Sequence, residues 1–343
     1  MKASIEPRIN LQGRTRLETV VPLSTPMTLF VDPTNLCNYK CSFCPTGDRA
    51  LIKSTGRWQG LMSLETYGRV IEGLKEFAKP LKVLRLYKDG EPFLNPDFAE
   101  MVRLASASGV ADFIDTTTNG TYLQADRVIP AIEAGLGRLN ISVNGLDDEM
   151  FMDLARVKVD WQKYKKTIQT LYKYKGNCEI SIKIVGDKLT DEQKQYFYEC
   201  FGDYADRIFI ENLAPCWPVF DTEERAGVVI TEGIYQQEIS RTEVCPYIFY
   251  SMAVNPDGLV SLCFLDWARN LIIGDLKTQS LKEVWEGEEM LKRRLQHLEG
   301  RRSEDSTCGN CGQLTHCRPD NIDPYAAEIA ERLLASRERP KAG

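Results

Sequence analysis

Between residues 28 and 213, short runs of apolar and often β-branched residues alternate with longer amphipathic stretches. The apolar runs predict strands over Thr28 to Asp32, Val83 to Tyr87, Phe113 to Thr117, Leu139 to Val143, Ile180 to Val185 and Ile208 to Glu211. The amphipathic stretches predict helices over Ser63 to Phe77, Asp97 to Ser108, Ala125 to Ala134, Asp147 to Leu154, Trp161 to Tyr174 and Asp191 to Phe201. Strands that alternate with helices lie parallel, with right-handed crossovers between them. We therefore expect an α/β fold, either an open doubly wound sheet or a partial (β/α)6 barrel of the TIM type.

This alternation ends after residue 213. Residues 214–243 contain prolines and a charged stretch, and they are predicted to be a connector. Two short strands are predicted next, over Tyr250 to Val254 and Leu259 to Cys263. The turn between them reads Asn-Pro-Asp-Gly and places Gly258 where a positive φ is favoured. The pattern thus predicts that a second region begins with a hairpin.

The remainder of the chain is predicted to be mostly helical. One helix is expected over Leu281 to Leu298 and another over Pro324 to Ser336, with the cysteine-rich stretch from Cys308 to Cys317 between them. The predicted organisation is an N-terminal extension (1–27), a core (28–213), a connector (214–243), a cysteine-rich domain (244–322) and a C-terminal helix and tail (323–343).

Composition and charge narrow the expected partners. The chain has 343 residues, of which 43% are hydrophobic and 27% are charged, as in ordinary globular proteins. Its net charge of -6 disfavours nucleic acid as a partner, because nucleic-acid-binding surfaces are basic. The N-terminus lacks the apolar core of a secretion signal, and no run approaches the length of a membrane span. We expect a cytoplasmic protein that binds neither nucleic acid nor a membrane.

The cysteine content is unusual for such a protein. The sequence contains 11 cysteines and only two histidines. Cytosolic thiols stay reduced, so clustered cysteines bind metal more often than they form disulfides. Any metal site in this chain must therefore rely mainly on thiolates.

Cys37, Cys41 and Cys44 follow directly after the first predicted strand. Active sites of parallel β/α folds lie at the carboxyl ends of the strands, so this loop lies where chemistry is expected. A short loop with this spacing can give three thiolates to a 4Fe-4S cluster and leave one iron without a protein ligand. Structural zinc normally takes four ligands, and no fourth cysteine or histidine lies nearby. Three unrelated thiols are the alternative interpretation.

The spacing, with the aromatic Phe43 before the last cysteine, resembles the signature of the radical S-adenosylmethionine (SAM) superfamily. The resemblance implies that SAM chelates the open iron and that Phe43 packs near the adenine. It also implies that reduction of the cluster cleaves SAM to methionine and a 5'-deoxyadenosyl radical, which abstracts a hydrogen atom from the substrate. A flavodoxin- or ferredoxin-type protein is the expected electron donor.

The resemblance extends to the ends of the later strands. The second strand ends in Lys-Asp-Gly-Glu-Pro, similar to the family's Gly-Gly-Glu-Pro element but with Asp89 at the first glycine; a simple turn is the alternative. Gly90 is expected there because the backbone must approach a ligand closely. The implied SAM contacts are Phe43, Gly90, Glu91, Pro92, Thr118, Asn119, Ser142, Asn144, Arg156 and Val185. Asn144 stands where Asp is common in the family, and Arg156 is equally well explained as a surface residue.

A second group of cysteines lies in the last third of the chain: Cys245, Cys263, Cys308, Cys311 and Cys317. Their pattern resembles the SPASM region of radical SAM enzymes, and more narrowly its shortened twitch form, because no cysteine follows Cys317. The resemblance implies one auxiliary 4Fe-4S cluster held by the first four, with Cys317 as a possible replacement or a free thiol. Structural zinc is the alternative, since a Cys-x-x-Cys pair with two distant cysteines also suits it. The remaining cysteines are expected to be ordinary thiols: Cys178, Cys200 and Cys216.

The cysteine pattern resembles most the 2-deoxy-scyllo-inosamine dehydrogenase type, whose members oxidise a secondary alcohol. We therefore expect a radical SAM oxidoreductase that passes an electron to its auxiliary cluster and oxidises a small sugar- or aminocyclitol-like alcohol. The residues expected near the substrate are Tyr87, Lys88, Asp89, Phe264, Asp266 and Trp267. One alternative is a SPASM enzyme that dehydrogenates a peptide or protein or forms a thioether in it. A more distant one is a zinc-stabilised binding protein without catalysis.

Overall fold

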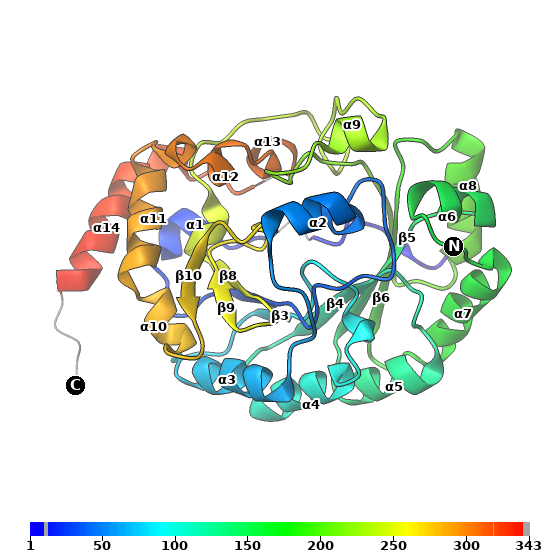
Figure 1. Cartoon of the computed structure of the whole chain (residues 1–343), viewed down its shortest axis with the longest axis horizontal. Coiled ribbons are helices and arrows are strands. Elements are labelled where there is room, and N and C mark those ends of the chain that lie inside the picture. Colours follow the sequence, from blue (N-terminus) through cyan, green and yellow to red (C-terminus); the bar gives the residue numbers. More distant parts are fainter. Residues whose placement is uncertain (10–12, 318, 339–343) are drawn as a thin grey trace.

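The computed structural model describes residues 1–9, 13–317 and 319–338 and contains one continuous sheet of ten strands (Figure 1). The strand order is β1-β7-β6-β5-β4-β3-β2-β8-β9-β10. Neighbouring strands from β2 to β7 pair in parallel. These six are β2 (Thr28–Val31), β3 (Val83–Arg85), β4 (Ile114–Thr118), β5 (Arg138–Val143), β6 (Glu179–Val185) and β7 (Arg207–Glu211). The sequential order of six parallel strands confirms the partial barrel.

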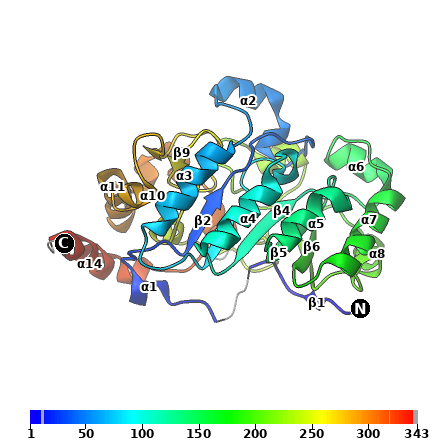
Figure 2. The same cartoon turned by 90° about the horizontal axis from the view of Figure 1, so that it is seen from below.

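Helices cover the outer side of these strands (Figures 1 and 2). They are α3 (Leu64–Lys75), α4 (Phe98–Ser108), α5 (Ala125–Glu133), α6 (Asp148–Leu154), α7 (Trp161–Tyr174) and α8 (Asp191–Phe201). Each lies within one or two residues of its predicted bounds. Side-chain caps explain several starts: Ser63 accepts from the Thr66 amide, and Thr190 forms a capping box with Gln193.

The strands have two chemically different faces. On β6, Ile180, Ile182 and Ile184 belong to the hydrophobic core shared with the helices, whereas Ser181 and Lys183 point to the opposite, inner face. The same alternation gives β3, β4 and β7 inner positions that carry charge or hydroxyl groups. The inner face of the barrel is therefore polar, and this face underlies the candidate site.

The C-terminal region continues the same sheet. Strand β8 (Ser251–Val254) pairs in parallel with β2, and β9 (Leu259–Ser261) turns back antiparallel to β8. Gly258 has φ +88°, which confirms the expected turn. A further strand that the sequence did not predict, β10 (Ile272–Asp275), completes the edge. At the other edge β1 (Ser4–Ile5), from the N-terminal extension, pairs with β7.

The single helix predicted over 281–298 is wrong, because the structure divides it. Helix α10 (Leu281–Trp285) ends before Gly287, which is the N-cap of α11 (Glu288–Leu298). The other helices are α1 (Leu17–Val20), α2 (Arg49–Thr55), α9 (Thr222–Ala226), α12 (Ser306–Gly309), α13 (Gln313–His316) and α14 (Ala326–Glu338). Short 3-10 turns are η1 (Pro45–Gly47), η2 (Pro92–Leu94), η3 (Pro246–Phe249), η4 (Arg302–Glu304) and η5 (Asp323–Tyr325). Among the residues that the structure describes, none of the helices has both the length and the apolarity needed to cross a bilayer.

Candidate active site

The loop with Cys37, Cys41 and Cys44 leaves the carboxyl end of β2 and lies over the inner face of the barrel (Figure 1). Backbone hydrogen bonds fold it tightly: the Cys44 amide donates to the Cys41 carbonyl (3.2 Å) and the Gly47 amide to the Cys44 carbonyl (2.9 Å). Burial raises the pKa of the Cys37 thiol to about 12, and burial likewise raises the pKa of Cys41 and Cys44. The three thiols are close enough for the charge of each to disfavour ionisation of another. Such thiols ionise readily only when a bound cation compensates them.

Helix α6 holds the cysteine loop from one side. The Lys40 amide donates to the Ala155 carbonyl and the Ser42 amide to the Leu154 carbonyl, each at 2.9 Å. These two carbonyls at the C-terminal end of α6 have no partner within the helix itself, so the loop satisfies them. Arg156 follows with φ 52° and an exposed side chain. No contact of Arg156 with the cysteine loop is present, so its role toward SAM stays a prediction.

Two glycines allow the loop to pack this closely. A Cβ on Gly47 would lie 2.5 Å from the Cys41 carbonyl oxygen, and a Cβ on Gly90 would lie 2.2 Å from that of Thr34. Both contacts are with backbone that cannot move aside. Gly90 thus accommodates the cysteine loop itself, and its expected contact with a ligand stays a prediction. Gly47 was not predicted, because nothing in the local sequence shows which backbone it faces.

Glu91 connects the ends of three strands below the loop. Its amide donates to the Leu36 carbonyl (2.9 Å), and its carboxylate accepts from the Thr118 hydroxyl (2.8 Å) and the Asn119 amide (2.7 Å). Burial raises the pKa of Glu91 to about 7, against the effect of these donors. The Asn119 side chain donates to Asn38 at 2.8 Å and lies 3.9 Å from the Cys37 sulfur. The structure thus brings Glu91, Thr118 and Asn119 together beside the first cysteine, and Pro92 begins η2 after them.

A second group of predicted SAM contacts borders a cavity of about 410 Å³ on the other side of the loop. Phe43 and Val185 line it together with Met150 and Leu213. Ser142 is half-buried on the inner face of β5, and Asn144 is buried just beyond that strand. The structure therefore divides the predicted contacts into two groups on the two flanks of the cysteine loop.

A buried ion network lies between the loop, the end of β3 and the C-terminal region. Asp89 pairs with Arg57 (3.1 Å) and with Lys88 (2.8 Å), and all three side chains are fully buried. Burial and the nearby Asp89 carboxylate raise the pKa of Asp32 to about 8. Arg57 stacks on the Trp267 ring at 4.3 Å.

This network reaches the other residues that were expected near the substrate. The Trp267 indole donates to the Thr46 hydroxyl (2.9 Å), and Lys88 donates to the Asp266 carbonyl (3.3 Å). Asp266 itself accepts the Asn270 and Leu271 amides at 2.8 and 3.0 Å. Through these contacts Lys88, Asp266 and Trp267 connect the barrel to the C-terminal region. Their contact with substrate stays a prediction.

Tyr87 belongs to a group of polar side chains inside the barrel, which is called the inner chamber below: Arg8, Tyr87, Thr117, Lys183 and Glu211. Its hydroxyl accepts from Arg8 (2.5 Å), which also lies 3.4 Å from the Thr117 hydroxyl, and from Arg85 (3.1 Å). Arg85 pairs with Asp115 at 2.7 Å. Arg8 belongs to the N-terminal extension, and its contact with Tyr87 spans 79 positions of sequence. The extension therefore contributes a cation to the barrel interior, which no local pattern indicated.

The far wall of the inner chamber carries Lys183 and Glu211, which form a close ion pair between β6 and β7. Tyr235 from the connector contacts Phe209 ring to edge and lies near Glu211 and Arg8. Sequence reasoning missed Lys183 and Glu211. The signal was present in the lysine and serine that interrupt the isoleucines of β6 at every second position.

Phe264, also expected near the substrate, belongs to a row of aromatic rings. It stacks on Phe30 at 4.4 Å and meets Tyr247 at 5.6 Å, while Phe30 lies 5.9 Å from Tyr87. The row thus runs from the inner chamber to the segment that follows Cys245.

Four of the later cysteines line one cavity: Cys245, Cys263, Cys308 and Cys311. Its other walls include Ile248, Leu265 and Leu271, so the surroundings are largely apolar. Burial raises the pKa of the Cys245 thiol to about 12, and a neighbouring thiolate at Cys311 adds to this. Cys317 does not line the cavity; it lies near Cys311 and toward Glu211. Within residues 1–9, 13–317 and 319–338, no three His, Cys, Asp or Glu side chains are grouped closely enough to hold a single metal ion.

Two family models match the chain over these two cysteine regions. The model described as the radical SAM superfamily matches residues 31–199, and the SPASM model, described as an iron-sulfur cluster-binding domain, matches residues 245–312. The chain is a radical SAM protein with a SPASM domain. The matches confirm SAM and iron-sulfur clusters as cofactors.

Curated relatives of this radical SAM protein include GTP 3',8-cyclases. The protein from Vibrio cholerae serotype O1 is 33% identical over 123 residues, which is 36% of this chain and 35% of the relative. The protein from Chlorobaculum tepidum is 35% identical over 124 residues, or 36% and 34% of the two chains. The chain thus matches about a third of the length of these relatives.

Solved structures are similar over more of the radical SAM protein. BtrN in complex with AdoMet and 2-DOIA has a TM-score of 0.55 at 17% identity and covers 83% of this chain and 92% of its own. SuiB from Streptococcus suis bound to precursor peptide SuiA has a TM-score of 0.61 at 17% identity, with coverages of 88% and 73%. The protein anSMEcpe with bound AdoMet has a TM-score of 0.57 at 17% identity, with coverages of 92% and 100%. At these identities the similarity shows the shared fold.

The residues of both cysteine regions fit iron-sulfur clusters. The first loop gathers three thiols whose ionisation requires a compensating cation, next to an amide donor from Asn119. The four later cysteines surround a mainly apolar cavity and do not converge on one ion position. A zinc ion needs its four ligands at about 2.0–2.3 Å, whereas thiolates around a polynuclear cluster bind different irons.

The contacts of Gly47 predict that Gly47→Ala selectively loses the N-terminal cluster. The added methyl group meets the Cys41 backbone, so the loop must open, whereas the SPASM cavity is untouched. Iron in the anaerobically reconstituted protein is expected to fall from about eight to about four per chain. Gly68→Ala on α3 is the matched control, because a Cβ there meets no atom within 4 Å. Full iron content in Gly47→Ala would contradict the prediction.

Proposed function

We propose that this radical SAM enzyme oxidises a secondary alcohol of a compact, polar substrate, such as a sugar or an aminocyclitol, to a ketone. The observation that carries the proposal is the group of polar side chains that forms the inner chamber. These side chains come from the β3 segment, from β4, β6 and β7 and from the N-terminal extension.

The inner chamber suits a ligand rich in hydroxyl groups. Arg8 and Lys183 can donate hydrogen bonds, Glu211 can accept them, and Tyr87 and Thr117 can do both. These groups already pair with one another, but the buried Arg8 Nε atom has no hydrogen-bond partner, and leaving such a donor unpaired costs about 1–3 kcal/mol. A hydroxyl group of a small polyol or amino sugar can accept from this donor.

Glu211 is the proposed proton acceptor. Its side chain is 3% exposed, it lies at the carboxyl end of β7, and it forms an ion pair with Lys183. A ketone forms when the carbinol carbon loses a hydrogen atom and the alcohol loses a proton and an electron. The balanced reaction is secondary alcohol plus SAM giving ketone, methionine, 5'-deoxyadenosine and a proton, and Glu211 holds that proton first.

The cofactors are assigned to the residues that the structure groups. Cys37, Cys41 and Cys44 are the proposed ligands of the SAM-binding cluster, and Cys245, Cys263, Cys308 and Cys311 those of one auxiliary cluster. When bound, the first cluster with SAM supplies the radical that removes the hydrogen atom, and the second supplies an acceptor for the electron. The proposed SAM contacts are Phe43, Gly90, Glu91, Pro92, Thr118, Asn119, Ser142, Asn144, Arg156 and Val185.

The aromatic row supports an electron acceptor in the SPASM domain. Tyr247 and Phe264 each lie within two positions of a proposed auxiliary ligand, and through Phe30 they connect to Tyr87 in the inner chamber. Neighbouring rings in the row lie 4.4 to 5.9 Å apart, so the row is continuous from Tyr87 to Tyr247. BtrN, similar over 83% of this chain, was crystallised with AdoMet and 2-DOIA, and this also favours a small substrate.

A peptide substrate is the second candidate. SuiB and anSMEcpe have TM-scores as high as that of BtrN, and each was crystallised with a peptide. For this chain the reaction would then be peptide dehydrogenation or thioether formation by the same clusters.

Label transfer distinguishes these substrates. The reconstituted enzyme with SAM and a reductant is offered sugars and aminocyclitols deuterated at each carbinol carbon, or precursor peptides encoded near its gene. We expect deuterium in 5'-deoxyadenosine, together with a ketone, from one of the polyols. Label transfer from a peptide and from none of the polyols would favour the second candidate, and an absence of any 5'-deoxyadenosine would contradict radical chemistry.

Single cysteine variants test whether the first cluster is needed for SAM cleavage and the auxiliary cluster for ketone formation. Cys41→Ala is expected to abolish SAM cleavage, because it removes a ligand of the SAM-binding cluster. Cys308→Ala is expected to retain part of the SAM cleavage and to stop ketone formation. Both products are measured in the same reactions by mass spectrometry. Equal loss of both activities in both variants would mean that the auxiliary cluster mainly supports folding.

The role of Glu211 predicts a specific defect. Glu211→Gln keeps the size and an oxygen next to Lys183 but cannot take up a proton, so kcat for ketone formation should fall about 100-fold. SAM cleavage without substrate should remain, which raises the amount of 5'-deoxyadenosine formed per ketone. Glu238→Gln, an exposed change in the connector, is the control. An unchanged ketone yield in Glu211→Gln would assign proton removal to another group.

A further inference from the structure

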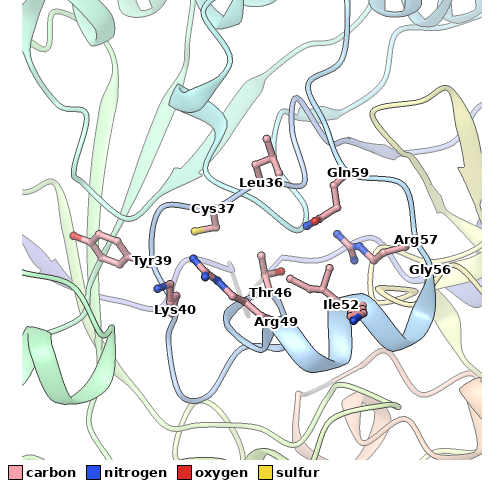
Figure 3. Close-up of a pocket in the computed structure, with 11 residues that line it drawn as sticks. Leu36, Cys37, Tyr39, Lys40, Thr46, Arg49, Ile52, Gly56, Arg57 and Gln59 are labelled. Carbon is pink, nitrogen blue, oxygen red and sulfur yellow. The ribbon is translucent and has the colours of Figure 1, made fainter.

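A second hollow, of about 520 Å³, opens on the outer side of the cysteine loop (Figure 3). Cys37 and Tyr39 form part of its wall, and α2 forms the opposite side. The hollow is lined by the cations Lys40, Arg49, Lys53 and Arg57 and by no acidic side chain. Figure 3 shows Arg49 extending from α2 toward Cys37. A strongly basic surface thus lies directly against the loop of the SAM-binding cluster.

Three of the four charges are available to a partner. Arg57 is neutralised by Asp89, but Lys40, Arg49 and Lys53 are exposed, and none forms an ion pair with any residue that the structure describes. The chain as a whole has a net charge of -6, so this surface has the opposite sign to the net charge of the protein. Helix α2 stands out from the rest of the molecule in Figure 2, which leaves the patch open to a large partner.

An apolar rim borders the basic hollow. Leu36, Trp58 and Leu61 are 37%, 46% and 41% exposed. They lie side by side, because Asn35 donates to the Trp58 carbonyl (2.7 Å) and Thr34 forms a bridge with Leu61. Exposed tryptophan beside arginine is typical of the residues that contribute most to protein-protein binding. The apolar rim can pack against a partner protein, and the free cations can attract an acidic one. This combination is typical of a docking surface.

We propose that this surface, made of Lys40, Arg49 and Lys53 with the rim of Leu36, Trp58 and Leu61, binds a small acidic protein that carries single electrons. SAM cleavage consumes one electron at the cluster, and the carrier protein is oxidised by one electron in supplying it. An acidic carrier is attracted to the free cations, and docking here puts its redox group on the side of the loop where Cys37 lines the hollow. The inference rests on radical SAM chemistry and is independent of the alcohol substrate.

The test measures reduction by flavodoxin, a representative acidic carrier. Reduced flavodoxin is mixed with the reconstituted enzyme and SAM without organic substrate, and flavodoxin oxidation and 5'-deoxyadenosine are followed. In the double variant Arg49→Glu/Lys53→Glu, kcat/KM for flavodoxin should fall at least about tenfold at low salt. For the unchanged enzyme it should fall steeply with ionic strength. Trp58→Ala should raise KM for flavodoxin without changing the salt dependence.

Two controls separate docking from structural damage. Reduced methyl viologen, a small cation that basic residues do not attract, should drive SAM cleavage equally in all variants. The double variant Lys163→Glu/Lys166→Glu makes the same change of net charge at exposed positions of α7 and should leave the flavodoxin rate within about twofold of the unchanged enzyme.

Three results would overturn the proposal. The first is that Arg49→Glu/Lys53→Glu lowers the flavodoxin rate no more than Lys163→Glu/Lys166→Glu does. The second is an equal loss with methyl viologen, which would make the cations structural. The third is a raised KM for the organic substrate in viologen-driven turnover, which would make the hollow part of the substrate site. A failure of the alcohol proposal changes none of these rates, because no organic substrate is present in the flavodoxin assay.

Discussion

The buried ion pair between Arg57 and Asp89 holds the site together, because each partner belongs to a different segment. Arg57 follows α2, Asp89 ends the β3 segment, and Trp267, on which Arg57 stacks, belongs to the SPASM region. Removing one partner of such a pair leaves a buried charge uncompensated and costs about 3–5 kcal/mol. The cysteine loop, the Gly-Glu-Pro turn and the auxiliary region are therefore fixed relative to one another by a few side chains. This also explains why Asp89 occupies the place of a glycine: its carboxylate is needed to neutralise Arg57 and Lys88.

The polar inner chamber depends on a second constraint, the alternation of side chains along each strand. The isoleucines of β6 pack against the helices and provide burial, which leaves Ser181 and Lys183 free to face inward. The inward charges are compensated within the barrel by Glu211 and Asp115. The same strands thus provide stability on one face and recognition on the other. The aromatic row of Tyr247, Phe264, Phe30 and Tyr87 then connects this polar interior to the SPASM region.

Periodicity and cysteine spacing predicted the partial barrel and grouped four later cysteines correctly. They did so because strand alternation and loop spacing are local properties. Sequence reasoning missed Arg8, whose contact with Tyr87 depends on how the N-terminal extension crosses the barrel. The helix over 281–298 was predicted as one because its apolar positions keep a helical period through Gly287. The Arg8 contact depends on distant segments, whereas the helix division is local and occurs at Gly287.

The inner chamber, the proposed SAM contacts and the exposed cations of α2 lie on different sides of the cysteine loop. The inner chamber lies below the loop, the proposed SAM contacts flank it, and the exposed cations of α2 lie outside it. The cavity with four cysteines lies on the SPASM side, beyond the aromatic row. In the proposed reaction, the electron that enters from the α2 side and the electron that leaves toward the SPASM side therefore use different sides of the cysteine loop.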